Sequence, residues 1–502
     1  MELLNHLALG FSVALTPGNL VYALVGALLG TLIGVLPGIG PVATIAMLLP
    51  TTFTLEPVSA LIMLAGIYYG AQYGGSTTSI LLNMPGETSS AVTCLDGYQM
   101  ARQGNAGAAL SVAALGSFFA GCVATIMIAT VAVPLSEFAL KFGPAEYCSL
   151  MVLGLVGSVV LAHGSLLKAI AMVIVGLLLG IVGTDVGTGT PRFVFGIPEL
   201  ADGIGVVSVA MGLFGFAEII SNLESVEKRE ILTAKLGGMW PTRAQFRQCW
   251  RAVLRGTGLG SLLGLFPGGG AMLASFASYA LEKKLADDPT RFGKGAIEGV
   301  AGPESANNAG AQSSFIPLLT LGIPENAVMA LMVGAMTIHS IQPGPQVMTT
   351  NPALFWGLIA SMWVGNLMLV VLNLPLIGIW IKLLHVPYRL LYPAILLFCA
   401  IGVFTTNNAT FDVMQTAFFG LVGVLFVKLA CEPAPLLLGF VLGPMLEENL
   451  RRAMLLARGN ALVFVKRPLS LAMLTLAVAL LLLIVLPHFR KTREQAFREP
   501  GS

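Results

Sequence analysis

Two clusters of small hydroxyl and amide side chains contain the residues of this sequence that are best suited to hold a small ligand. The first cluster covers residues 72–79 and 83–88, and the second covers residues 302–314 and 320–326. Hydroxyls, amides and backbone N–H groups left free at helix N-termini donate hydrogen bonds to a carboxylate, and the helix dipole adds a favourable potential. Free carbonyls at the opposite helix ends suit Na⁺. We therefore predict that each cluster supplies part of a site for a carboxylate and a cation.

The predicted site residues fall into two groups. Substrate contacts are expected from Gly74, Gly75, Ser76, Thr77, Thr78, Asn307, Asn308, Gln312, Ser313 and Ser314. Cation binding or proton transfer is expected from Glu304, Glu87, Asn83, Thr320 and Gly322. The simpler interpretation is that each Ser or Thr bonds only to the backbone of its own helix.

Glu304 is the leading acidic candidate, with Glu87 and Asp96 behind it, because acidic side chains in apolar surroundings are costly and tend to be functional. Three roles for Glu304 stay open: a cation ligand, a proton carrier, or a capping carboxylate at a helix start. Neither cluster contains a basic side chain, and Arg102 and Arg192 lie outside them. Helix ends and a bound cation must then balance the charge of an anionic substrate, which favours cation symport.

Two Pro-Gly segments precede the clusters, at residues 37–41 and 267–270. Such residues leave backbone groups of a membrane helix unpaired, which is tolerated only against protein or a water-filled cavity. We expect both segments to be broken or re-entrant helices near the membrane midplane. The predicted substrate site therefore also includes Pro37, Gly38, Gly40, Gly268 and Gly269. The spaced glycines before the first segment have a simpler explanation, since small residues at every fourth position allow close helix packing.

The elements that carry these residues are predicted to be membrane helices. Of the 502 residues, 56% are hydrophobic and 10% are charged, whereas soluble domains carry roughly 25% charged residues. Apolar stretches of about 20 residues, the length that crosses a bilayer, recur along the chain, for example at residues 103–136 and 147–167. We predict an all-α polytopic membrane protein with about 11 or 12 membrane segments, some of them re-entrant.

The chain also contains two copies of one sequence module. Residues 26–40 and 256–270 are identical at eight of fifteen positions, at an offset of 230, and a weaker match between residues 76–85 and 315–324 has an offset of 239. The nine extra residues fit a charged insert near residues 283–294. No basic residue precedes the first copy, whereas residues 226–255 before the second copy are rich in Lys and Arg. Because basic loops stay in the cytoplasm, we predict two inverted repeats, a common plan of secondary transporters.

We accordingly divide the chain into a first repeat unit (1–225), a basic cytoplasmic linker (226–255), a second repeat unit (256–445) and a C-terminal segment with a final membrane helix (446–502). Basic residues flank that final helix on both sides, so the side on which the chain ends stays open. No Lys or Arg precedes Arg102, and we therefore expect no cleavable signal peptide.

Several classes of protein are set aside. The formal charge of +2 is too small and too scattered for a nucleic-acid partner. The six cysteines are far apart and predict neither a disulfide nor a metal cluster. No HExxH, GxSxG or GxxxxGK[ST] motif occurs, so we expect neither an enzyme nor ATP hydrolysis, and no cofactor beyond a coupling ion. Energy must come from an ion gradient or a partner.

Four ordered strings resemble the TctA-type large membrane subunit of the tripartite tricarboxylate transporters, over roughly residues 18–445. They are LPGIGP at 36–41, YGAQYGGSTTSI at 69–80, NMPGE at 83–87 with DG at 96–97, and GPESANNA at 302–309. The resemblance implies a multi-pass subunit of the bacterial inner membrane that works with a small four-helix TctB-type membrane subunit and a periplasmic TctC-type solute-binding protein.

The resemblance further implies import driven by Na⁺ or H⁺, with citrate, other tricarboxylates, dicarboxylates or aromatic acids as substrates, and an elevator-like motion of the motif regions. Whether the chain acts alone or as a homodimer stays open. The alternative in a different class is a passive channel or a non-transporting membrane scaffold subunit, whose glycines serve packing only.

Overall fold

The structure is a computed structural model, and it describes residues 2–36, 40–162, 165–185, 187–224, 238–266, 270–384 and 388–485. The predicted site residues Pro37, Gly38, Gly268 and Gly269 lie outside the described residues. The described residues are mostly helical, as predicted, and their only strands form one antiparallel pair, β1 and β2.

The first half of the chain contains the following elements: α1 (Glu2–Ala14), α2 (Pro17–Val35), α3 (Pro41–Leu48), η1 (Leu49–Thr54), α4 (Pro57–Leu82), η2 (Thr88–Ser90), α5 (Thr93–Arg102), α6 (Ala106–Ala139), α7 (Pro144–Leu161), α8 (Leu166–Gly180), β1 (Gly183–Thr184), β2 (Pro191–Arg192), η3 (Pro198–Asp202), α9 (Val206–Ala210), η4 (Met211–Phe216) and α10 (Ala217–Glu224). The second half contains the following: α11 (Arg243–Leu263), α12 (Gly270–Leu285), η5 (Pro289–Arg291), α13 (Glu298–Ser313), α14 (Phe315–Leu321), α15 (Ala327–Ile338), α16 (Val347–Thr350), α17 (Pro352–Asn373), α18 (Ile377–Leu383), α19 (Tyr388–Asn407), α20 (Thr410–Lys428), α21 (Ala434–Leu456), α22 (Val463–Lys466) and α23 (Pro468–Val485).

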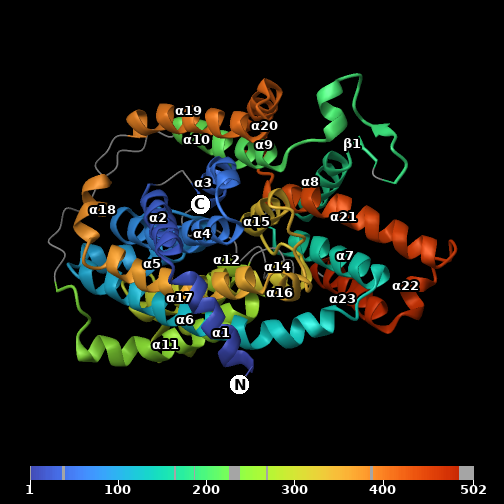
Figure 1. The fold of residues 1–502 in the computed structure, drawn as a ribbon. Helices are drawn as coiled ribbons and strands as arrows, with labels where there is room; N and C mark the ends of the chain where they lie inside the picture. Colours follow the sequence, from blue (N-terminus) through green and yellow to red (C-terminus); the bar gives the residue numbers. More distant parts are fainter. Residues whose placement is uncertain are drawn as a thin grey trace.

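Helix α4 lies beside α2 (Figure 1) and is buried from Ser59 to Leu82. Proline at its first turn fits the free N–H position there, and its last residue is followed by Asn83 in the left-handed conformation (φ 58°), which ends the helix before Pro85. Helix α14 ends in the same way, with Gly322 at φ 73° before Pro324. Both polar clusters are thus carried by buried helices with a defined C-terminal stop.

The spaced glycines of α2 allow it to pack closely along α4. A Cβ atom on Gly26, Gly30 or Gly34 would overlap the backbone carbonyl of residue 63, 67 or 71 of α4, respectively. The contacts advance together along both helices, so α2 and α4 run parallel. The packing interpretation of these glycines is supported, and the small residues bring two backbones together without a ligand.

The second copy repeats this contact pattern with a different sequence separation. A Cβ atom on Gly256, Gly260 or Gly264 of α11 would overlap the carbonyl of residue 302, 306 or 310 of α13. The contacting residues are 37 positions apart in the first copy and 46 in the second. The difference is the nine residues that the sequence match places near residues 283–294, between α12 and α13.

The α2–α4 pair and the α11–α13 pair run in opposite directions where they meet. The rings of Tyr68 and Phe315 lie 6.4 Å apart, whereas Ser76, further along α4, contacts Glu304, which comes earlier on α13. The run α13–α14 is therefore antiparallel to α4. This is the local direction that two inverted copies require, while the symmetry of the whole repeats stays a prediction.

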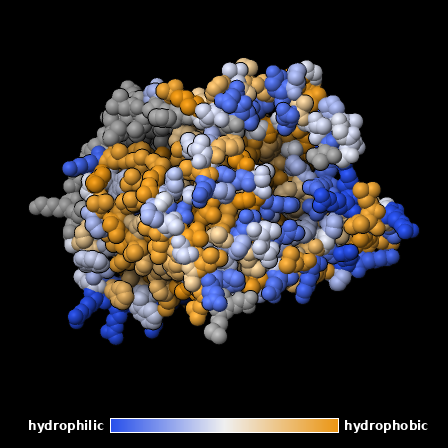
Figure 2. Space-filling view, in the orientation of Figure 1, coloured by the Kyte–Doolittle hydropathy of each residue, from blue (hydrophilic) through white to orange (hydrophobic). Residues whose placement is uncertain are grey.

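Apolar side chains cover part of the outer surface of the molecule, and several helices are suited to a membrane. Four described helices are long and apolar enough to cross a membrane, namely α2, α6, α17 and α20, and seven further apolar helices have 10–17 residues. Figure 2 shows hydrophobic side chains over much of the left half of the view, where α2 and α17 lie in Figure 1. The exposed apolar side chains of α2 and α17 include Val21, Leu24, Leu28, Leu367 and Val371, each at least 43% exposed. These features agree with a multi-pass membrane protein, and the number of segments stays a prediction.

Candidate transport site

The carboxylate of Glu304 joins the two predicted clusters. Its Oε2 accepts a hydrogen bond from the hydroxyl of Ser76 on α4, and its Oε1 accepts one from the hydroxyl of Thr93 on α5. The exposed fraction is 0% for Glu304 and Thr93 and 4% for Ser76. In the described part of the chain, no Lys, Arg or His forms an ion pair with this carboxylate. Its ionised form is therefore held only by neutral donors, which is costly at such burial.

Amide side chains continue the polar face of α13 beyond Glu304. The Asn308 Nδ2 donates to the Ser117 hydroxyl of α6 at 2.6 Å and to the backbone carbonyl of Glu304 at 3.1 Å. One turn further on, the Gln312 Oε1 accepts a weak bond from Thr125 at 3.5 Å. Helix α6 therefore supplies hydroxyls to the same face as α4 does.

Asn307 has an unusual environment. It is fully buried, and among the described residues neither its Oδ1 nor its Nδ2 has a hydrogen-bond partner. The Oδ1 of Asn308 and the Nε2 of Gln312 are unpartnered as well. Because buried polar groups are nearly always paired, these free amide groups on α13 are the positions at which a polar ligand would satisfy the protein.

The structure differs from one expectation about backbone geometry. The clusters were expected to offer free N–H groups at helix N-termini, but residues 74–78 lie inside α4 and residues 304–313 lie inside α13. Their backbone N–H groups are used within the helices. Glu304 lies six residues after the start of α13 and is not a capping residue. Any ligand contact in the clusters must come from side chains.

The simpler interpretation of the hydroxyls fits Ser314 and Thr320, whereas Thr78 and Ser313 bond both to their own helix and to a neighbouring one. Ser314 and Thr320 donate to the carbonyls of residues 311 and 316 of their own helices, at 2.7 and 2.6 Å. Thr78 donates to Gly74 and to Gly34 of α2, at 3.1 and 3.0 Å. Ser313 makes the equivalent pair of longer bonds, to residues 310 and 260. The last two hydroxyls connect helices within each copy.

The other residues predicted to bind a cation or carry a proton include Asn83, Gly322 and Glu87, and none of them is hydrogen-bonded to Glu304 in the described structure. Asn83 is exposed and Gly322 is buried, each at the end of its helix. Glu87 borders the site, since a Cβ atom on Gly75 would lie 3.3 Å from its Cγ. The Oε1 of Glu87 has no hydrogen-bond partner among the described residues.

Asp96 has a structural environment. Its Oδ1 accepts from the backbone N–H groups of Gly293, Gly295 and Ala296 at 2.9, 2.7 and 2.7 Å, and its Oδ2 accepts from the Tyr279 hydroxyl at 2.9 Å. These four bonds use the carboxylate to hold the loop before α13 against α5 and α12. Asp96 thereby positions α13 rather than offering a free ligand group.

A carboxylate accepts a backbone N–H at the start of each helix that follows a Pro-Gly segment, from the residue before α3 and from the first residue of α12. The Gly270 N–H donates to the Glu325 Oε1 at 2.5 Å, and the Gly40 N–H donates to the carboxylate of Glu218 on α10. Gly40 and Gly270 are matching positions of the two copies, yet the carboxylates come from unrelated segments. The favourable field of a helix N-terminus for negative charge explains both contacts.

Several site residues were not predicted from the sequence. Glu325 lies inside the second cluster, where its acidic side chain marks it in the sequence as a candidate. Thr93, Ser117 and Glu218 stand outside the clusters, and no spacing in the sequence marks them. Only long-range packing brings them to the site.

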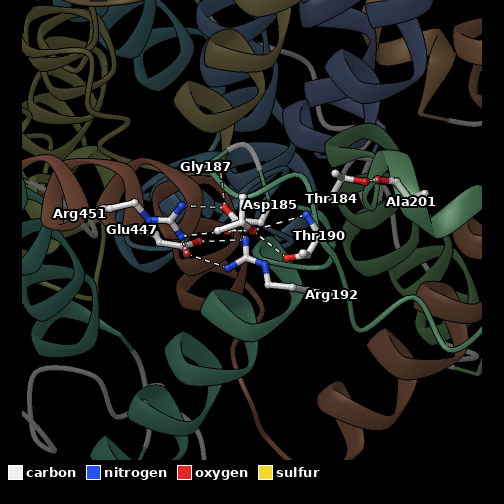
Figure 3. Close-up of polar contacts among 9 residues, drawn as sticks. Thr184, Asp185, Gly187, Thr190, Arg192, Ala201, Glu447 and Arg451 are labelled. Carbon is white, nitrogen blue, oxygen red and sulfur yellow. Dashed lines mark hydrogen bonds and ion pairs between the residues drawn. The ribbon is translucent and has the colours of Figure 1, made fainter.

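Arg192 pairs with other residues outside both clusters. Figure 3 shows it at the end of β2, where it donates to both Glu447 oxygens at 2.7 and 3.1 Å. Arg451 of α21 donates to both oxygens of Asp185 at 3.0 and 3.1 Å, and to Glu447 at 2.9 Å. These four side chains, which we call the hairpin lock, attach the β1–β2 hairpin to α21.

The chain is similar to known proteins over most of its length. A model of the tripartite tricarboxylate transporter TctA family matches residues 20–438. An Agrobacterium vitis protein described as an uncharacterized 52.8 kDa protein in the TAR-I ttuC' 3' region is 60% identical over 499 residues, which are 99% of each chain. A second Agrobacterium vitis protein, described as an uncharacterized protein in the TAR-II ttuC' 3' region, is 60% identical over 240 residues, which are 48% of this chain and 99% of that one. No solved structure matches.

Proposed function

The chain belongs to the tripartite tricarboxylate transporter TctA family, and from this premise we propose that it is the large membrane subunit that moves a carboxylate across the bacterial inner membrane together with a cation. A TctB-type membrane subunit and a TctC-type periplasmic solute-binding protein are its proposed partners. The solute-binding protein would deliver the carboxylate, and the gradient of Na⁺ or H⁺ would supply the energy.

The observation that carries this proposal is the contact of Glu304 with Ser76 and Thr93. It joins parts of the two copies through one buried carboxylate without a basic partner among the described residues. A negative charge in such a place attracts a cation or a proton strongly, because the surroundings screen it poorly. An anionic substrate would be repelled until that charge is neutralised. Cation and carboxylate are therefore expected to bind together, which is the requirement for symport.

The free amides of α13 are the proposed substrate contacts. Asn307 lies three residues after Glu304, and its Nδ2 is an unused donor. A carboxylate oxygen would accept that hydrogen bond, and unsatisfied Gln312 offers a second donor one to two turns further on. Side chains on one rigid helix would hold the substrate next to the neutralised Glu304.

The direction of the helices supports alternating access. Helices α11 and α12 pack antiparallel: Gly264, just after α11, lies beside Gly270 at the start of α12, and Arg255 in the middle of α11 donates to Glu282 near the end of α12 at 2.7 Å. We propose that this antiparallel pair enters and leaves the membrane on one side. With α4 antiparallel to α13–α14, inverted units would exchange inward-open and outward-open forms.

The proposal is tested by uptake into proteoliposomes that contain the three subunits. Transport should follow a Na⁺ or H⁺ gradient, and collapsing that gradient should abolish accumulation. Glu304→Gln should lower coupled uptake at least about a hundredfold, the loss expected when an essential charge is removed, and Asn307→Leu should do the same through lost binding. Glu137→Gln, an exposed change on α6, is the matched control.

Two outcomes would contradict symport. Uptake that persists unchanged without a gradient would favour the passive channel. Near-normal accumulation by Glu304→Gln would remove that carboxylate from the coupling step.

A further inference from the structure

A small polar cavity lies between α4, α6 and α17, beside the Glu304 contact. Its polar lining comes from Tyr73, Ser76, Thr77, Ser117 and Asn373, and the remaining lining residues are Leu or Ala. Its size is about 10 Å³, the room of a single water-sized particle. Every polar group in this lining carries an uncharged oxygen.

The oxygen of Asn373 is free to bind a ligand. Asn373 is 4% exposed, and its Oδ1 has no hydrogen-bond partner among the described residues. Its Nδ2 donates to the carbonyl of Leu369 at 3.0 Å and approaches the hydroxyl of Thr31 at 3.4 Å. Because a carbonyl accepts and never donates, these contacts fix which end of the amide is the oxygen.

Ser76 connects the cavity with a negative charge. Its hydroxyl proton is donated to the Glu304 carboxylate, and Ser76 also lines the cavity. A hydroxyl oxygen that donates its proton keeps lone pairs that can bind a further group. Ser117 likewise accepts from Asn308 at 2.6 Å, which holds it in place. A cation in the cavity would be separated from Glu304 by a single hydroxyl group.

We propose that this cavity binds one Na⁺, with Asn373, Thr77 and the Ser76 and Ser117 hydroxyls as oxygen ligands and Glu304 as the nearby compensating charge. This inference rests on the proposed function and specifies its coupling ion. Hard cations are held by oxygen atoms that replace their hydration shell. Divalent cations recruit carboxylate ligands directly, whereas a neutral oxygen shell with one carboxylate behind it matches a single positive charge.

Sodium binding also explains the coupling in physical terms. The bound ion would offset the charge of Glu304 and lower the repulsion that a substrate carboxylate meets on α13. The ligands come from α4, α6 and α17, so an occupied cavity would hold these three helices in one arrangement.

The test uses the full chain, purified in detergent, and measures binding of ²²Na⁺ together with the thermal stability in NaCl, KCl or choline chloride. The wild-type protein should bind one Na⁺ and should be stabilised by NaCl alone. Asn373→Leu and Thr77→Val should each weaken Na⁺ binding by at least about tenfold, since each removes one buried ligand oxygen. Asn373→Asp, which keeps the oxygen, should retain binding.

Thr31→Val is the matched control. It removes the weaker partner of the Asn373 amide nitrogen and leaves the ligand oxygen, so Na⁺ affinity should stay within about threefold of wild type. If Asn373→Leu does not fold, Thr77→Val, whose side chain has the same shape, provides the decision.

Unchanged Na⁺ binding in both folded ligand variants would overturn the site. A wild-type protein that binds no Na⁺, while the reconstituted complex follows an H⁺ gradient, would overturn this inference and leave the proposed symport intact. Loss of all gradient dependence would instead contradict the proposed function itself.

Discussion

At the residue scale, the chemistry of the site depends on how neutral groups surround a few carboxylates. Glu304 receives two hydroxyl donors, whereas Asp96 receives three backbone N–H groups and a tyrosine hydroxyl. The carboxylate with full coordination has a structural role, and the carboxylate without a compensating charge is the one suited to a cation. The sequence could single out Glu304 because its cluster is long and polar. It could not single out Thr93 or Asn373, because their contributions depend on helices that are distant in the chain.

The hairpin lock provides a pH prediction outside the membrane. The Thr188 hydroxyl, followed by the Arg451 guanidinium and the Gly187 N–H, holds the pKa of Asp185 well below its usual range. The folded pKa is thus lower than the unfolded one, which is about 3.9. The stabilisation is therefore fully present above that value and is lost as the pH falls through the folded pKa.

Asp185→Asn should therefore expose the hairpin to proteolysis or hydrogen exchange at pH 7, relative to wild type. The difference between the two proteins should shrink below about pH 4, where Asp185 of the opened hairpin begins to bind protons while the folded carboxylate is still ionised. Hydrogen exchange of residues 183–192 measures this directly. A difference that stays constant down to pH 2 would contradict the assigned role of the carboxylate.

At the element scale, small residues decide which helices approach each other. The sequence indicated correctly that glycines at every fourth position serve packing, since α2 contacts α4 and α11 contacts α13 through them. The clusters themselves were expected to combine side-chain donors with backbone N–H groups left free at helix N-termini. They instead lie inside helices, where close neighbours bury residues 74–78 and 304–313 completely enough to override propensity. Local composition cannot report this packing.

Two glycines of α11 separate packing from propensity. A Cβ atom on Gly258 meets nothing within 4 Å, whereas one on Gly260 would lie 2.8 Å from both the carbonyl carbon and the Cα of Ala306. Gly258→Ala should stabilise the helix by about 0.5–1 kcal/mol, the usual gain from removing a helical glycine. Gly260→Ala should destabilise the protein by about 1–3 kcal/mol, because backbone must move apart.

Thermal unfolding of both variants in the same detergent measures these changes. The direction of the difference is the decisive quantity, since the two substitutions are chemically identical and two residues apart. Equal melting temperatures would contradict the close contact of α11 with α13.

At the scale of the whole molecule, the two copies share a plan while their supporting contacts differ. Corresponding glycines contact corresponding carbonyls in both copies, although the sequence separation between the contacting residues is nine residues longer in the second copy. Helix α4 runs antiparallel to α13–α14. The carboxylates at Gly40 and Gly270 nevertheless come from α10 and from the loop after α14. The sequence match predicted the shared part. It could not predict the capping carboxylates, because these come from outside the matching strings or from positions where the copies differ.

The inverted arrangement predicts that the segments at which the first helices of the two copies start face opposite sides of the membrane. Gly18, at the start of α2, and Gly238, before α11, are both exposed and have no neighbour within 4 Å of an added Cβ atom. In a background without the six native cysteines, Gly18→Cys should react with an impermeant maleimide in intact spheroplasts. Gly238→Cys should react only after lysis, because the adjacent basic segment keeps it in the cytoplasm. Since neither position has a neighbour to shield it, the difference in labelling reports the side of the membrane, and labelling of both from one side would rule out the inversion on which alternating access depends.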